Sequence, residues 1–112
     1  MSKKYLRKNE FRMDNNPTHF GRENQPHPAY ISKRKKHMLY ANTITHSRTS
    51  NGVPNFNIDE NPNKMSKDKR QTRISPPFWQ NEKQFSAEKL SHFRFSNKTR
   101  KQIKKINKKF KQ

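Results

Sequence analysis

The chain contains no cysteine, which excludes disulfide bonds, thiol nucleophiles and zinc sites built on cysteine. Its only glycines are Gly21 and Gly52, too few for a glycine-rich loop that cradles phosphates. No pair of carboxylates is arranged as in a glycosidase, and none of the five histidines has other ligands at the spacing of a metal site. We therefore expect no metal, no cofactor and no catalytic activity.

Apolar residues are also scarce. They make up 26% of the 112 residues, compared with roughly 45–50% in a globular domain when glycine is counted. Little apolar surface is available to offset the entropy of ordering the backbone, about 1–2 kcal/mol per residue, so we expect a small, partly disordered α+β protein with a minimal core. No apolar run approaches the ~18 residues of a membrane span, and the basic first residues lack the apolar segment of a secretory signal. We expect a cytoplasmic protein without a transmembrane segment.

Charge of one sign dominates the chain, with 27 Lys and Arg against 8 Asp and Glu and a formal net charge of +19. A surface that serves only solubility would mix the two signs, so this excess predicts an anionic partner, most commonly nucleic acid. RNA is favoured over duplex DNA because no helix-turn-helix or zinc module is recognisable in the sequence. An anionic membrane surface and an acidic protein are the alternatives.

Residues 1–36 are predicted to be a disordered basic N-terminal arm. Proline, glycine and asparagine interrupt every periodic pattern there, and the apolar residues are scattered. The arm ends in Lys-Arg-Lys-Lys at 33–36, which we interpret as a solvated or phosphate-facing run of charge. A nuclear localisation signal is the weaker alternative for so short a cluster.

Residues 37–95 are predicted to form a small α+β module. The stretch 37–45 has the aromatic and β-branched residues typical of a strand, and the turn at Asn51-Gly52 leads to a second short strand that ends at Ile58. Because a lone hairpin is marginal in water, we expect this irregular β-hairpin to be packed by short helices, one of them capped by Ser86. The apolar side chains expected to cover it are Phe78, Trp79, Phe85, Leu90 and Phe93.

Residues 96–112 are predicted to form a basic amphipathic C-terminal helix with Ser96 as its N-cap. Apolar or small residues recur every three or four positions and form one stripe, which comprises Phe95, Thr99, Ile103, Ile106 and Phe110. Phosphate binding does not require an apolar stripe. We therefore expect the helix to dock on the module or on a partner, with its lysines turned toward the anion.

The candidate nucleic-acid-binding residues are all basic. Arginines on or near the module would position the strand, and the terminal helix would supply most of the affinity through phosphates. These residues are Arg48, Arg70, Arg73, Arg100, Lys101, Lys104, Lys105, Lys108 and Lys109. In the alternative interpretation, an interaction protein docks the same helix in a groove on a partner protein, with Ile103, Ile106 and Phe110 as anchors.

His46 is the weak candidate for catalysis. It lies between Thr45 and Ser47 at the end of the candidate strand, and a metal-independent ribonuclease could use it as a general base beside an arginine that holds the phosphate. We favour a structural role, in which the Thr-His-Ser step ends the strand through hydrogen bonds from side chain to backbone. The aromatics also allow two interpretations, a platform for stacking unpaired bases or a core, and we favour the core. They are Tyr40, Phe56, Phe78 and Trp79.

Several short motifs are spread over about residues 37–110. They are Thr45-His46-Ser47, Thr49, Gly52, Asn57-Ile58, Asn61-Pro62-Asn63, Asp68, Arg70, and Phe95-Ser96 followed by the Lys/Ile-rich segment. This pattern resembles that of uncharacterised small basic proteins of Gram-positive bacteria and their mobile genetic elements. Lys64 departs from it, because a second proline is expected there. The resemblance implies a bacterial origin and a single small module, and it supplies no activity.

Overall fold

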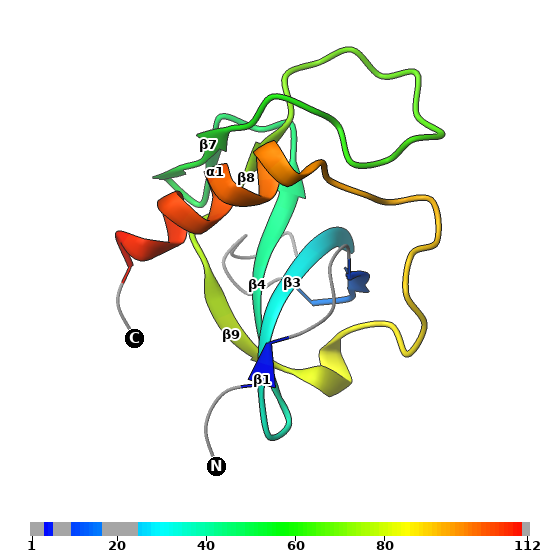
Figure 1. Ribbon diagram of the computed structural model, residues 1–112, viewed down its shortest axis with the longest axis vertical. Helices are drawn as coiled ribbons and strands as arrows, with labels where there is room; N and C mark the ends of the chain where they lie inside the picture. The colour runs from blue at the N-terminus through cyan, green and yellow to red at the C-terminus, as the bar shows by residue number, and fades with distance from the viewer. Residues whose placement is uncertain (1–3, 6–9, 17–24, 111–112) are drawn as a thin grey trace.

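The computed structural model describes residues 4–5, 10–16 and 25–110, with side chains from Glu10 onward. The fold is a small α+β fold in which one antiparallel sheet is built on two long strands, β3 (His27–Lys35) and β4 (Met38–Thr45) (Figure 1). A tight turn joins these strands, and its first residue, Lys36, takes a left-handed φ of 55°.

Shorter strands extend the sheet on both sides of this central pair. β1 (Lys4–Tyr5) and β2 (Phe11–Asp14) pair with successive parts of β3, while β9 (Phe78–Asn81) and β8 (Arg73–Ile74) pair with successive parts of β4. The outer strand β7 (Phe56–Asn57) pairs with β8, and β5 (Thr49–Ser50) and β6 (Val53–Pro54) form a separate two-stranded hairpin. The central strands are thus held by segments that are distant in the sequence.

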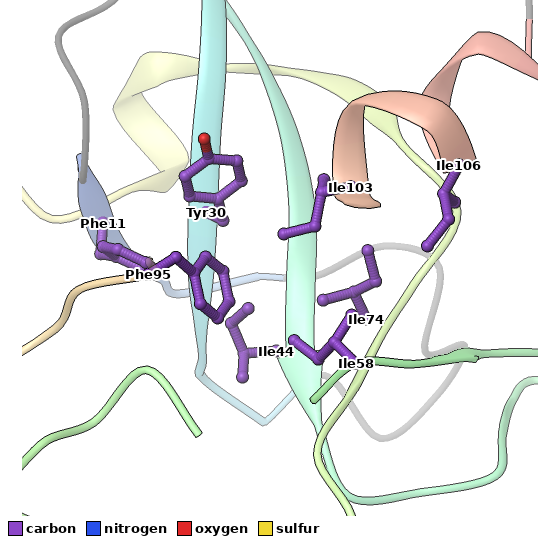
Figure 2. Packing of buried hydrophobic residues seen from close by; sticks show 8 residues of the cluster. All are labelled: Phe11, Tyr30, Ile44, Ile58, Ile74, Phe95, Ile103 and Ile106. Atoms are coloured by element: carbon purple, nitrogen blue, oxygen red, sulfur yellow. The ribbon is translucent and has the colours of Figure 1, made fainter. Parts of the chain in front are cut away.

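The two faces of the sheet bury different apolar clusters, because successive side chains of a strand point to opposite faces. One cluster lies between the sheet and the C-terminal helix, and Figure 2 shows its members. They are Phe11, Tyr30, Ile44, Ile58, Ile74, Phe95, Ile103 and Ile106. The second cluster contains Ala29, Ile31, Leu39, Ala41 and Phe85, with Phe78 packed against it.

The helix α1 (Asn97–Lys108) begins as the sequence predicts. The Ser96 hydroxyl oxygen accepts a hydrogen bond from the backbone N–H of Thr99 and caps the first turn. Thr99, Ile103 and Ile106 form its buried stripe against the sheet. Next to the stripe, the side-chain amides of Asn107 and Asn42 exchange two hydrogen bonds of 2.9 and 3.1 Å. The helix is therefore docked on the chain's own sheet. Among the described residues, none of the helices is long and apolar enough to cross a membrane.

The predicted disordered arm over residues 1–36 is wrong for two segments, Phe11–Asp14 and His27–Lys35, which are strands β2 and β3. Phe11 is fully buried and Ile31 is 1% exposed, so both belong to the core. Few apolar residues are needed in these strands, because β2 contributes only Phe11 to the two buried clusters and β3 only Ala29, Tyr30 and Ile31. Residues 1–3, 6–9 and 17–24 of the predicted arm lie outside the described part of the chain.

The strand predicted at 37–45 is confirmed as Met38–Thr45, but the predicted hairpin partner is wrong. The turn at Asn51-Gly52 closes only the short β5–β6 hairpin, and the second predicted strand pairs with β8 instead. Among the described residues, a 3₁₀ turn at Glu82–Gln84 is the only helical element before α1. Ser86 caps no helix; its hydroxyl accepts from the backbone N–H of Met13 and so fastens β2.

Candidate nucleic-acid interface

A concave groove of about 480 Å³ lies between β3 and α1. Two of its lining residues, Tyr30 and Ile103, belong to the core beneath it and are 9% and 1% exposed. Four cations complete most of its wall: Lys33, Arg100, Lys101 and Lys104. The remaining lining residues are Ser32, Asn97 and Asn107. We call this site the β3–α1 groove; its lining combines four positive charges with an apolar base and no carboxylate.

The rotation of about 100° per residue divides the basic residues of α1 into two sets. Arg100, Lys101 and Lys104 lie on the side of the helix that lines the groove. Lys98, Lys105 and Lys109 are exposed and point away from both the groove and the core. Lys108 is exposed and shares the rotational position of the first set, but it lies further along the helix and does not line the groove. Of the six basic helical residues predicted from the sequence, three therefore share one concave site.

Lys33 is the groove cation that is absent from the nucleic-acid-binding residues predicted from the sequence. It belongs to the basic cluster at 33–36, and its Nζ also lies 4.8 Å from the centre of the Tyr40 ring. The next residue, Arg34, is directed to the other face and pairs with Glu82, which lowers the pKa of that carboxyl. The cluster is thus divided by the alternation of the strand, and only Lys33 joins the groove.

The apolar anchors of the partner-groove interpretation are occupied within the chain. Ile103 and Ile106 lie in the cluster beneath α1, and Phe110 packs on Phe56 with ring centres 5.8 Å apart. A partner could reach the two isoleucines only after the helix had left the sheet.

The aromatic residues serve the core. Tyr40 is buried and stacks on Trp79 with ring centres 4.8 Å apart, while Phe56 and Phe78 pack against the two apolar clusters. The burial of Tyr40 confirms the preferred interpretation of this residue as part of the core. Phe56, Phe78 and Trp79 are half-buried at the margin of the core.

His46 lies at the end of β4 between two acceptors. Its Nδ1 is 3.1 Å from the backbone oxygen of Gln71, and its Nε2 is 3.4 Å from a carboxylate oxygen of Asp68. Both ring nitrogens therefore face oxygen atoms of the chain, whereas a general base needs a ring nitrogen directed at its substrate. The backbone N–H of Ser47 donates to the Thr45 hydroxyl, the strand-ending hydrogen bond expected for the Thr-His-Ser step. This geometry supports a structural role.

Three of the four predicted arginines, Arg48, Arg70 and Arg73, lie outside the lining of the groove. Arg70 donates a 2.6 Å hydrogen bond to the carboxylate of Asp68, which holds the pKa of that carboxyl far below its ordinary value. Arg73 donates to the backbone oxygen of His46 and to the side chain of Asn57. Arg48 is exposed on the loop before β5. Two of the three arginines are therefore engaged in hydrogen bonds within the chain.

Glu60 fixes the N-terminal end of α1. Its carboxylate accepts from the backbone N–H of Ser96 and from Lys64 Nζ, both at 2.7 Å. Burial of the carboxyl opposes its ionisation, but hydrogen bonds from Lys64, Thr99 and Ser96 outweigh burial and lower the pKa of Glu60 to about 2. A negative charge at this end is also favoured by the helix dipole.

We expect acid to weaken the fold through Glu60. Because its pKa is lower than the ordinary 4.5, the ionised carboxylate stabilises the fold above about pH 4.5, and this contribution is lost as the pH falls toward 2. The contribution is on the order of 2 kcal/mol. Urea unfolding measured across this acidic range should show a flatter pH dependence for Glu60→Gln than for Asp59→Asn, the matched change at the exposed neighbour. Parallel curves for the two variants would contradict this role.

Within the described part of the chain, no three His, Asp or Glu side chains come together in a group that could hold a metal ion. The chain matches no model of a protein family, and neither curated proteins nor solved structures give a match. The function must therefore be inferred from the geometry and charge of the chain itself.

Proposed function

We propose that this protein binds nucleic acid through the phosphate backbone, which it receives in the β3–α1 groove. The observation that carries this proposal is the convergence of Lys33 with Arg100, Lys101 and Lys104, from segments more than sixty residues apart, on one concave surface. No carboxylate lines the groove, and two nearby acidic residues, Glu60 and Glu82, are paired with Lys64 and Arg34, which lie outside its lining.

The placement of these cations is unfavourable without an anion. Like charges on one helix face repel each other, and α1 carries no acidic residue to offset this. A phosphate backbone removes the repulsion and releases its own counterions, so the affinity should fall steeply with salt.

We favour RNA over duplex DNA as the ligand. The apolar side of α1 is used for docking, and among the described residues a 3₁₀ turn is the only other helical element, so α1 is not the second helix of a helix-turn-helix that enters a major groove. A concave groove with lysines on its rim follows one strand more readily than it follows a duplex.

Two variants of equal charge test the proposal. The groove variant replaces Lys33, Lys101 and Lys104 with Gln, and the outer variant replaces Lys98, Lys105 and Lys109 with Gln. We expect the groove variant to lose at least about ten times more affinity for RNA, and its plot of log affinity against log salt to flatten by about 2–3, because each lost phosphate contact removes about 0.7–0.9 from the slope.

Fluorescence anisotropy with a labelled RNA, titrated at several salt concentrations, measures both quantities. Equal losses in the two variants would show that the helix attracts RNA by its overall charge and would contradict the groove. Absence of binding by the unmodified chain at low salt would contradict the proposed function itself.

A further inference from the structure

The lining of the β3–α1 groove contains two donor groups that have no partner within the described part of the chain. One is the hydroxyl of Tyr30, a side chain that is only 9% exposed. The other is the guanidinium of Arg100 in the first turn of α1. Neither group forms a hydrogen bond or an ion pair with a described residue, and the Arg100 Nε is buried. Because unpaired donors are unfavourable in a buried position, a ligand with several acceptor atoms would stabilise both.

The two donors are close enough to act on each other. Burial raises the pKa of the Tyr30 hydroxyl, and the positive charge of Arg100 acts on the same hydroxyl in the opposite direction. The hydroxyl therefore stays protonated near pH 7 and can donate. The ring of Tyr30 is fixed by Phe11 and Phe95, with ring centres 5.3 Å apart, and Figure 2 shows the hydroxyl pointing away from both rings. One ligand in the groove can therefore accept from both donors.

A phosphate at the end of a strand fits these donors better than a phosphate within it. The guanidinium can donate to two phosphate oxygens at once, and the hydroxyl can donate to a third. A terminal phosphate has three such oxygens and a charge of about −1.5 to −2, whereas an internal phosphate has two and a single charge. A terminal phosphate also projects from the strand and can reach a recessed hydroxyl, whereas an internal phosphate has a sugar on each side.

We infer that the β3–α1 groove binds the terminal phosphate of a nucleic-acid strand, which accepts hydrogen bonds from the Tyr30 hydroxyl and the Arg100 guanidinium. Lys33, Lys101 and Lys104 line the same groove and attract this phosphate and those that follow it along the strand. This inference rests on the proposed function and adds to it a preference for strands that carry a phosphate at one end.

Two variants of unchanged charge test the inference. Tyr30→Phe deletes the hydroxyl and keeps the ring that packs on Phe11 and Phe95. Arg100→Lys keeps the positive charge and loses the planar pair of donors. Because the two changes lie on different elements, the test survives if one variant does not fold. Arg94→Lys is the matched control, because Arg94 is exposed and does not line the groove.

The probes are single-stranded RNAs with an internal fluorescent label. Two 12-nucleotide strands carry a phosphate at the 5′ end or at the 3′ end. A 14-nucleotide strand with hydroxyls at both ends has nearly the same total charge, because its two additional internal phosphates replace the charge of the terminal one. The comparison at matched charge separates recognition of a terminal phosphate from the general attraction of a basic protein, and the two 12-nucleotide strands show which end supplies it.

We expect the unmodified chain and Arg94→Lys to bind one of the end-phosphorylated strands at least about fivefold more tightly than the 14-nucleotide strand, a modest effect for hydrogen bonds to a charged group. Tyr30→Phe and Arg100→Lys should each lose most of this preference. The preference is a ratio of two affinities measured on the same variant, so a general loss of affinity does not by itself change it.

Equal affinity of the unmodified chain for the end-phosphorylated strands and the 14-nucleotide strand would overturn the inference while leaving binding of the phosphate backbone intact. A preference that is unchanged in Tyr30→Phe and Arg100→Lys would also overturn it, because the terminal phosphate would then be recognised elsewhere. Failure of the unmodified chain to bind any of these strands at low salt would instead overturn the proposed function.

Discussion

Replacing Phe11 with alanine is expected to destabilise the fold by about 3–5 kcal/mol. The ring is fully buried between those of Tyr30, Phe93 and Phe95, with ring centres 5.1–5.6 Å apart. Its removal deletes these contacts and leaves a cavity that the surrounding rings cannot close completely. Because a small domain is stable by about 5–15 kcal/mol in total, the loss is a large part of its stability.

Urea unfolding of the purified chain measures this effect as a shift of the midpoint at constant slope. Met65→Ala is the control, because Met65 is 69% exposed and its truncation should change the unfolding free energy by less than about 0.5 kcal/mol. Equal midpoints for the two variants would show that β2 is not part of the core and would restore the prediction of a disordered arm.

Local patterns in the sequence were sufficient for α1 and for β4. The stripe of Thr99, Ile103 and Ile106 has helical spacing, and Ser96 is a good N-cap, so the helix could be predicted from residues close to each other. The strand Met38–Thr45 could be predicted because it is rich in aromatic and β-branched residues. Both elements could therefore be predicted from residues that are close together in the sequence.

The strand β2 could not be predicted in the same way, because its partner β3 is distant in the sequence; β3 itself pairs with β4 across the tight turn at 36–37. Phe11 and Tyr30 are paired across the sheet, yet nothing near either residue in the sequence indicates the other. Two partners of β4, β8 and β9, are likewise distant in the sequence, whereas β3 is joined to β4 by the nearest turn. Non-local pairing of this kind has no signal in a single sequence.

The groove depends on an irregularity of β3 that the sequence does not show. Ile31 pairs with Ala41 and Lys33 with Tyr40, so Ser32 is an extra residue at a bulge. The bulge reverses the alternation, and Lys33 consequently lies on the same face as Tyr30, three residues earlier. Regular alternation would have placed Lys33 on the opposite face. The basic residues of α1 were predicted from the sequence to bind nucleic acid. The groove that they form with Lys33 could not be predicted, because it depends on the bulge at Ser32.

Ile103→Ala should release α1 from the sheet and lower the unfolding free energy by about 2–5 kcal/mol. Ile103 is 1% exposed at the centre of the cluster beneath the helix, and it also forms the base of the groove. Lys105→Ala is the control on the outward face of the same helix, where alanine is at least as good a helix former and removes no packing.

The two variants separate the alternative roles of the apolar stripe when they are measured on the purified chain alone. If the stripe stabilises this fold, Ile103→Ala shifts the urea midpoint strongly and Lys105→Ala does not. If the apolar stripe instead serves to bind a groove on a partner protein, both variants keep the urea midpoint of the unmodified chain. That result would contradict the docking of α1 on the sheet. Because the docked helix positions three of the four cations of the groove, the first outcome also predicts that Ile103→Ala loses affinity for RNA under conditions where the rest of the sheet is still folded.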